Sequence, residues 1–271
     1  MGRRLKFLNR GKNGHYTEKS GLSVSFTNCY DNAVRADAYS RLEFANTYYL
    51  AFRDLPALFR RHVTGTSALD FGCGTGRSTR FTRQFGFETI GIDIAPEMIA
   101  KARELDPHGD HHLTKGGDFS GLSSHAFDLV LCMFPFDNIA GFAVKLGLFC
   151  QLASLLRNSG KLVNVVSSPE IYLHEWASFS TKDFPENRNA KSEDIVRIIT
   201  TDFADRTPAV DVLCTDDSYR QLYSQAGLAV VAMHKPLANG DEPYRWVSET
   251  KIAPWVIYVL ERSNGRRRAI H

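Results

Sequence analysis

Between residues 67 and 166, short apolar runs alternate with stretches of helical spacing. The apolar runs predict buried strands at 67–71, 88–93, 127–133 and 161–166. The stretches between them predict helices at 77–85, 96–105 and 142–156. Strands that alternate with helices at this pace form βαβ units, so this part of the chain should build a parallel sheet that helices cover on both faces.

The flanking regions add to this pattern. Apolar residues recur at helical spacing from Tyr30 to about Phe59, and a further helical turn beginning near Pro56 runs to His62. Residues 169–216 break the alternation, and two apolar runs, 195–200 and 209–213, predict an inserted β-hairpin. A helix capped by Asp217 and stopped by Gly227 should follow. The last two strands, 228–233 and 255–260, lack an intervening helix and should pair antiparallel.

Composition narrows the class of protein. The net charge of +3 is small for 271 residues, and much of the basic excess lies near the two ends, which argues against a nucleic-acid-binding surface. We find neither a run of about 18 apolar residues nor a secretory signal. The five cysteines form no CxxC pair, which predicts reduced, buried thiols and no metal site. A cytoplasmic location is therefore expected, without a membrane partner.

A glycine-rich loop lies between the first strand and the first helix of the alternating region. Its sequence is DFGCGTG at 70–76, and glycines in this position allow a ligand to approach the backbone. Asp93, at the end of the next strand, can accept the hydroxyls of a ribose. Asp70 would repel a pyrophosphate but attract a sulfonium or an ammonium group. The GxGxG spacing also departs from the GxGxxG of dinucleotide sites, although a nicotinamide cofactor stays the alternative.

The chain resembles class I S-adenosylmethionine-dependent methyltransferases of the small-molecule type. The glycine loop is similar to their first motif and GIDIAPEM at 91–98 to their second. Further similar segments follow in the family's order: GGDF at 116–119, FDLVLCMF at 127–134 and LRNSGKL at 156–162. The resemblance implies an α/β, Rossmann-like, seven-stranded, mostly parallel sheet with an antiparallel last strand and helices on both faces. An N-terminal helical lid and a β-hairpin insertion after strand 5 complete this expected fold.

The resemblance implies S-adenosyl-L-methionine as cofactor, with S-adenosyl-L-homocysteine as product, and it implies a role for each matching residue. The methionine part of the cofactor would lie against Asp70, Gly72, Cys73 and Gly74. The ribose would bind Asp93, and the adenine would lie near Ile94, Met98, Gly117, Asp118 and Phe119. The sulfonium would be flanked by Met133 and Phe134, and the lid would close through Tyr30 and Tyr39. Ordinary core packing is the alternative role for Phe119, Met133 and Phe134, and helix packing for the two tyrosines.

Candidate catalytic residues lie directly after the fifth strand, at the edge of the sheet where open α/β folds bind ligands. His174 is the first candidate for a general base, because its pKa lies near neutrality when unperturbed; Glu175 and Tyr172 are weaker candidates. A structural hydrogen bond is the alternative role for His174. Asp137-Asn138 resembles the metal-binding pair of catechol methyltransferases, but no third acid matches, so we expect helix capping there and no metal.

These features predict a single methyltransferase domain over residues 30–262, with a lid at 30–62 and a substrate cap at 169–216. A flexible segment at 1–29 and a basic tail at 263–271 would flank it. The expected activity is methyl transfer to an oxygen, nitrogen or carbon atom of a small molecule, with a place in specialised metabolism and an open possibility of a homodimer. Two alternatives remain: a protein that binds S-adenosylmethionine for another purpose, and an RNA methyltransferase.

Overall fold

The computed structural model describes residues 16–17, 23–24, 37, 44–116, 118–119, 121–202 and 204–263. Tyr30, Tyr39 and Gly117 therefore lie outside the described residues, as do most of the predicted flexible segment and the tail from residue 264. Two short strands, β1 (Tyr16–Thr17) and β2 (Ser23–Val24), pair antiparallel ahead of the main domain. Within the described part of the chain, no helix is long and apolar enough to cross a membrane.

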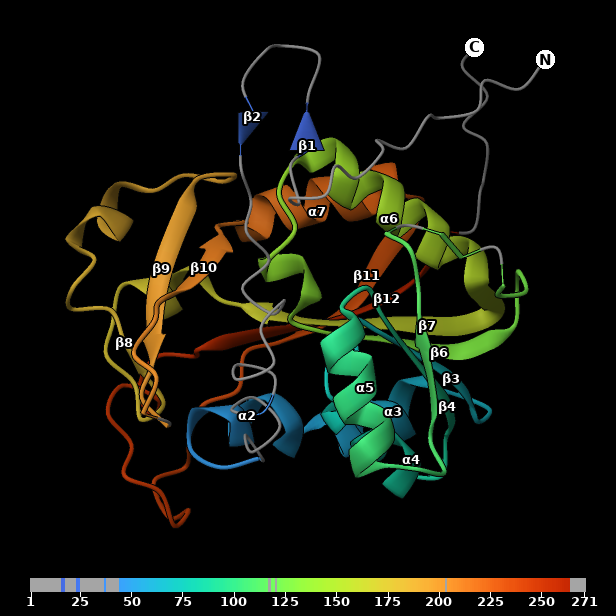
Figure 1. The fold of residues 1–271 in the computed structure, drawn as a ribbon, viewed down its shortest axis with the longest axis horizontal. Helices are drawn as coiled ribbons and strands as arrows, with labels where there is room; N and C mark the ends of the chain where they lie inside the picture. Colours follow the sequence, from blue (N-terminus) through green and yellow to red (C-terminus); the bar gives the residue numbers. More distant parts are fainter. Residues whose placement is uncertain are drawn as a thin grey trace.

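A seven-stranded sheet forms the centre of the domain (Figure 1). Its spatial order is β11-β12-β7-β6-β3-β4-β5. The strands are β3 (Ser67–Phe71), β4 (Glu88–Asp93), β5 (Asp110–Leu113), β6 (Phe127–Met133), β7 (Leu156–Ser167), β11 (Leu228–His234) and β12 (Trp255–Arg262). The pairs from β7 to β5 are parallel, whereas β12 runs antiparallel to both β7 and β11. This architecture confirms the predicted fold class.

Helices cover both faces of the sheet (Figure 1). Three of them pack with one apolar cluster: α2 (Thr47–Arg53), α3 (Leu55–His62) and α4 (Arg77–Gln84). Two others, α6 (Phe142–Leu155) and α7 (Asp216–Gln225), pack with the second cluster on the opposite face. Another helix, α5 (Pro96–Leu105), connects β4 to β5 and begins at Pro96, where proline needs no hydrogen-bond partner for a backbone N–H.

The inserted cap is larger than the predicted hairpin. The pair β9 (Ile195–Thr200) and β10 (Ala209–Val212) is present, and β8 (Phe179–Ser180) adds a third antiparallel strand. Two 3-10 helices, η2 (Pro169–Tyr172) and η3 (Pro185–Asn189), complete it. The cap lies at one end of the sheet, beside the carboxyl end of β7 (Figure 1).

Two predictions about local structure need correction. The N-cap of α7 is Thr215, whose hydroxyl accepts a bond from the Ser218 N–H at 3.4 Å, and Asp217 lies in the first turn. Threonine has the same capping chemistry as aspartate, so the sequence alone does not separate the two positions. Asp137 caps no helix: the turn after β6 is the 3-10 helix η1 (Pro135–Asp137), whose N-cap position is held by Phe134.

Candidate functional site

The glycine loop leaves β3 at the carboxyl edge of the sheet and leads into α4. All three glycines have positive φ angles: +72° at Gly72, +54° at Gly74 and +78° at Gly76. The N–H groups of Gly72 and Cys73 donate to the Ile92 carbonyl at 2.9 and 3.0 Å, which fastens the loop to β4. A Cβ at Gly74 would meet nothing within 4 Å, whereas one at Gly72 would lie 2.6 Å from Pro135 Cβ. The loop is therefore packed at Gly72 and open at Gly74.

Asp93 lies at the end of β4 and forms a hydrogen bond with the open part of the loop. Its Oδ2 accepts the Gly74 N–H at 2.8 Å, and its Oδ1 accepts the Ala95 N–H at 2.9 Å. Burial raises the pKa of the Asp93 carboxyl, and the backbone N–H bonds oppose that rise. Each carboxylate oxygen can accept more than one bond, so Asp93 retains acceptor capacity toward a ligand at Gly74.

Asp70 lies beneath the same loop and is fully buried. Its Oδ2 accepts bonds from the Ser78 and Thr79 hydroxyls at 2.7 and 2.6 Å, so the carboxyl ties the end of β3 to the first turn of α4. Its Oδ1 has no hydrogen-bond partner in the part of the chain that the structure describes. Burial raises the pKa of Asp70 to about 6, although the two hydroxyl bonds favour the ionised form. One buried acceptor is thus left unsatisfied under the loop, which is rare in native proteins.

The rim beyond β4 and β5 is apolar and accessible. Ile94 is 40% exposed and Leu113 is 49% exposed, whereas Met98 is buried behind them. The Phe119 ring lies 5.9 Å from the Phe71 ring between centroids. Asp118 is exposed close by in sequence. An exposed apolar rim next to a carboxylate that can hold a sugar suits a flat, partly apolar group such as a nucleobase.

Aromatic side chains line the other side of the loop. Phe134 follows β6 directly, and its ring centroid lies 6.2 Å from that of Tyr48 and 4.7 Å from that of Trp255. The Arg77 guanidinium carbon lies 4.7 Å from the Tyr48 ring centroid and 5.2 Å from that of Phe52. The Arg77 guanidinium thus lies between helix α2 and the end of the glycine loop, where cation–π contacts with the two rings stabilise it. The sequence offered no signal for this role of Arg77.

Comparisons with known proteins agree with this geometry. Residues 69–164 match a family described as "Methyltransferase domain". They contain the glycine loop, Asp93, the rim and the turn after β6. Over these residues the chain is similar to methyltransferases, in agreement with the family that the sequence motifs predict.

The sequence likeness to curated relatives covers only part of each chain. The demethylmenaquinone methyltransferase of Tropheryma whipplei is 36% identical over 105 residues, which are 37% of this chain and 41% of that protein. A ubiquinone biosynthesis O-methyltransferase of Xanthomonas euvesicatoria is 29% identical over 107 residues, which are 38% of this chain and 44% of that protein. The chain thus spans about two fifths of the length of these curated relatives.

A solved structure shows how far the fold extends. The S-adenosylmethionine-dependent methyltransferase of Clostridium acetobutylicum superposes with a TM-score of 0.58 at 12% sequence identity, covering 86% of this chain and all of that one. At this identity the likeness concerns the fold alone. The shared fold therefore reaches beyond residues 69–164, while the sequence likeness to the curated relatives covers less than two fifths of the chain.

The cap of the methyltransferase domain holds the three predicted catalytic residues in different surroundings. Tyr172 is buried and donates its hydroxyl to Asp211 Oδ2 at 3.0 Å. Glu175 accepts the Thr181 N–H at 2.6 Å. Partial burial raises the pKa of the Glu175 carboxyl, but hydrogen bonds from Thr181 and neighbouring residues outweigh this effect and hold the pKa below its usual value. The His174 side chain is 38% exposed, and its Nε2 lies 3.1 Å from Glu170 Oε2. Between the described residues, no hydrogen bond or ion pair joins these three to the glycine loop, so their catalytic role stays a prediction.

A buried carboxylate joins the cap to the methyltransferase domain. Glu249 is fully buried, and its Oε1 accepts the Thr47 hydroxyl and the Ala177 N–H, both at 2.7 Å. Its Oε2 accepts the N–H groups of Val247 and Ser248 at 2.8 and 3.1 Å. One side chain thus connects helix α2, the cap and the loop between β11 and β12. Sequence periodicity contains no signal for such a residue.

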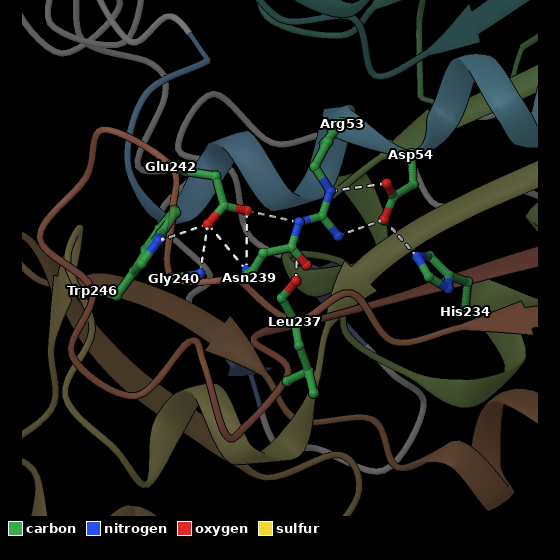
Figure 2. A network of polar contacts seen from close by, with 8 residues as sticks. All are labelled: Arg53, Asp54, His234, Leu237, Asn239, Gly240, Glu242 and Trp246. Atoms are coloured by element: carbon green, nitrogen blue, oxygen red, sulfur yellow. Dashed lines mark hydrogen bonds and ion pairs between the residues drawn. The ribbon is translucent and has the colours of Figure 1, made fainter.

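A second, partly exposed network fastens the same loop to helix α2 (Figure 2). Arg53 Nη1 donates to Glu242 Oε1 and to the Leu237 carbonyl, both at 3.0 Å. Two further nitrogens of Arg53 bond Asp54 at 2.9 Å, and Asp54 also accepts His234 Nε2 at 2.7 Å. Helix α2, the cap and the loop between β11 and β12 therefore form one connected unit.

Buried polar groups also gather around the turn after β6. Asp137 accepts the Ser167 N–H at 3.0 and 3.3 Å, instead of capping a helix as predicted. Asn138 Nδ2 donates to Asp211 Oδ1 at 2.6 Å. Among the residues that the structure describes, no group of three or more His, Cys, Asp or Glu side chains is arranged to hold a metal ion. These two residues instead connect the turn to β7 and to the cap.

Proposed function

We propose that the protein is an S-adenosylmethionine-dependent methyltransferase that acts on an oxygen, nitrogen or carbon atom of a small molecule. One observation carries the proposal: the loop is open at Gly74, whose N–H bonds Asp93, and it lies over Asp70, whose Oδ1 has no partner among the described residues. A sugar acceptor beside a buried acid suits a ligand that contains both a ribose and a cationic amino or sulfonium group.

The residues present fit this cofactor. Asp93 would accept the ribose hydroxyls, and the exposed rim at Ile94 would pack on the adenine. Asp70 would stabilise the positive charge of the methionine part from beneath the loop. Arg77, half-buried against two aromatic rings, carries the charge needed to bind a carboxylate.

The cofactor, when bound, supplies a methyl group on a positively charged sulfur, which is already activated for displacement. The protein then has to align the acceptor, exclude water and remove a proton where the acceptor carries one. The apolar rings of Tyr48, Phe134 and Trp255 would exclude water on the acceptor side. Of the three predicted catalytic residues, we favour His174 as base, because Tyr172 and Glu175 are engaged in buried or backbone bonds.

A small-molecule acceptor is supported by the cap, which lies beside the carboxyl end of β7. The curated relatives are named for demethylmenaquinone and for ubiquinone biosynthesis, and the residues that match the methyltransferase family end at 164, before this cap. We therefore infer a small acceptor bound by the cap, by α2 and by the loop between β11 and β12, and we assign specialised metabolism as its context. We further propose that the protein acts in the cytoplasm.

The proposal is tested by calorimetry with three ligands. S-adenosylmethionine and S-adenosylhomocysteine should bind with micromolar affinity, and NAD should not bind. Asp93→Ala should lower the affinity for both S-adenosylmethionine and S-adenosylhomocysteine by about 100-fold, because hydrogen bonds to a buried charged group contribute about 1.5–3 kcal/mol each. Binding of NAD alone would overturn the proposal. Transfer of labelled methyl groups to a panel of small acceptors and to RNA then separates the enzyme from a binding protein and from an RNA methyltransferase.

Asp70→Asn should change affinity and stability in opposite directions. The folded state raises the pKa of Asp70 from 3.8 to about 6, so its contribution to stability is lost as pH rises through 6. At pH 8 the Asn variant should therefore melt at a higher temperature than the wild type, yet bind S-adenosylmethionine at least about tenfold more weakly, since it lacks the negative charge. Wild-type affinity should fall between pH 7 and pH 5, and that of the variant should not. Equal pH profiles would contradict this role of Asp70.

A further inference from the structure

The turn after β6 holds an aromatic residue in a strained backbone conformation. Phe134 has φ +69° and ψ 2°, in the left-handed region that bulky side chains avoid. Three other non-glycine residues have a positive φ in the part of the chain that the structure describes: Asn46, His125 and Glu193. All three are polar, and asparagine and histidine adopt this region more readily than most residues. Phe134 is the bulky apolar exception, and strain of this kind gathers at functional sites.

Contacts on both sides impose the conformation on Phe134. Its N–H donates to the Val165 carbonyl at 2.9 Å, and its carbonyl accepts the Asp137 N–H at 3.2 Å. The next residue, Pro135, packs above Gly72, where a Cβ would come within 2.6 Å of the Pro135 Cβ. The backbone of the turn is therefore fixed by β7 on one side and by the glycine loop on the other.

The Phe134 ring lies at the accessible edge of an aromatic cluster. Its centroid lies 4.7 Å from that of Trp255 and 6.2 Å from that of Tyr48. Trp255 and Tyr48 are 2% and 7% exposed, whereas Phe134 is only half-buried. A glycine at position 134 would form the same backbone bonds without strain, so the turn itself does not require a phenylalanine. Part of the ring stays accessible beside the carboxyl end of β6.

The order of the strands brings this ring close to the middle of the proposed cofactor. The carboxyl ends of β4, β3 and β6 follow one another along the edge of the sheet, about 5 Å apart. In the proposed binding mode, Asp93 on β4 holds the ribose, and the adenine lies at the Ile94 rim on the side of β5. The rest of the ligand then extends from the ribose across the glycine loop toward β6. Phe134 is the first residue after that strand, and the sulfur, one carbon away from the ribose, is the first group to reach it.

We infer that Phe134 is a specificity-determining residue whose ring face distinguishes the sulfonium of S-adenosylmethionine from the neutral thioether of S-adenosylhomocysteine. The inference rests on the proposed function. The face of an aromatic ring attracts a cation, whereas an uncharged sulfur makes a weaker contact there. The strained turn holds the ring in place for this contact. A preference for the charged ligand lets a fresh donor displace the product after each methyl transfer.

Calorimetry with both ligands tests the inference without a known acceptor. The two ligands share the ribose, the adenine and the amino-acid part, so a change in the ratio of their affinities reports on the sulfonium. Phe134→Leu keeps an apolar side chain but has no ring face. Its affinity for S-adenosylmethionine should fall about fivefold, and its affinity for S-adenosylhomocysteine by about twofold or less. Phe134→Tyr keeps the ring and should keep the wild-type ratio.

Phe87→Leu is the matched control. The Phe87 ring is also half-buried and packs against Phe59, with centroids 5.4 Å apart. Phe87 directly precedes β4, so it lies at the amino end of that strand, at the opposite edge of the sheet from the glycine loop. Phe87→Leu should therefore leave the ratio of the two affinities unchanged.

Thermal unfolding tests the strain separately. Phe134→Gly and Phe134→Ala both remove the ring, but only glycine adopts a positive φ without strain, so Phe134→Gly should melt at the higher temperature. The order should be reversed at Phe87, whose φ is not positive, because glycine makes the unfolded chain more flexible. Phe134→Gly also lacks the ring face and should shift the affinity ratio as Phe134→Leu does, which keeps the test decisive if the leucine variant does not fold.

The outcomes separate this inference from the proposed function. If Phe134→Leu and Phe134→Gly keep the wild-type ratio, the ring does not recognise the sulfonium and the inference is overturned, even where both ligands bind more weakly. In that case, normal binding of both ligands by the wild type leaves the proposed function intact. If the wild type binds neither ligand, the proposed function fails and this inference fails with it.

Discussion

Replacing Gly74 by alanine should lower the affinity for S-adenosylmethionine by about 100-fold or more while the protein stays folded. A methyl group at this position meets nothing within 4 Å in the protein, so it causes no internal clash. It would instead project into the space where the ligand has to approach the loop backbone. Loss of close contact, together with displacement of the Asp93 bond to the Gly74 N–H, would remove about 3 kcal/mol of binding energy.

The control for this variant is Gly86→Ala. Gly86 follows helix α4 with φ +87°, and a Cβ there also meets nothing within 4 Å. Both variants place alanine in the left-handed region, which costs about 1–2 kcal/mol, so their melting temperatures should fall by similar amounts. Calorimetry should show normal binding for Gly86→Ala. Unchanged binding in Gly74→Ala would mean that the ligand does not lie on the open part of the loop.

Gly72→Ala is expected to behave differently from Gly74→Ala. Its Cβ would lie 2.6 Å from Pro135 Cβ, and φ is +72°. Two packed backbone segments would have to separate, so this variant should lose stability as well as binding. The comparison distinguishes the glycine required for packing from the glycine required for ligand access.

Removing the Glu249 carboxylate should cause the largest loss of stability. Glu249→Ala would leave four donors without their acceptor: the Thr47 hydroxyl and three backbone N–H groups. The Thr47 bond is buried and the three backbone bonds are partly buried. Unsatisfied donors cost up to about 1–3 kcal/mol each, less where water reaches them, and we expect about 3–5 kcal/mol in total. Because each kcal/mol of lost stability lowers the melting temperature by about 2–4 °C in a domain of this size, the melting temperature should fall by roughly 10 °C.

Glu249→Gln and Glu261→Gln provide the matched comparison. In Glu249→Gln the side-chain amide keeps the shape of the carboxylate but can accept on one side only, so this variant should lose about half of the stability that the alanine variant loses. Glu261 is an exposed acid of β12 that pairs with Lys161 at 3.2 Å, and its replacement should change stability by less than about 0.5 kcal/mol. Similar melting curves for Glu249→Ala and Glu261→Gln would show that the cap does not depend on the buried acid.

The stability of the cap and the function of the domain are linked through helix α2. Thr47 at its start bonds the Glu249 carboxylate, and Arg53 at its end bonds Glu242 (Figure 2). Between them Tyr48 lies against Phe134 and under Arg77. Loosening either attachment should therefore move an aromatic ring at the proposed site, and Glu249→Ala should also weaken acceptor binding.

Local pattern predicted most of the central sheet. The strands at 67–71, 88–93 and 127–133 have the predicted bounds, because buried parallel strands are short and almost wholly apolar. Strand β5 was not located, since its sequence DHHL is polar and only His111 is buried. The edge of a sheet needs few apolar residues, so hydrophobic pattern carries little information there.

Prediction from the sequence was weaker for the polar groups of the site. Asp70 and Asp93 were identified by their positions around the glycines, and the structure places both at the loop. Their partners, Ser78 and Thr79 on one side and backbone N–H groups on the other, depend on how the loop folds back. Asp137 was assigned to a helix cap because aspartate after a strand commonly caps, but its partner lies thirty residues away on β7.

The sequence by itself determined most of the strands and helices in their order, the glycine loop and the likeness to methyltransferases, because these depend on residues close together in the chain. Only the tertiary structure decided which charges are buried and what they bond. Glu249 meets Thr47 across 202 residues, and Asp211 meets Asn138 across 73. An aspartate or glutamate in the sequence does not reveal whether its carboxylate will be exposed to water or buried in the core. Its role is therefore set by the segments that folding brings around it.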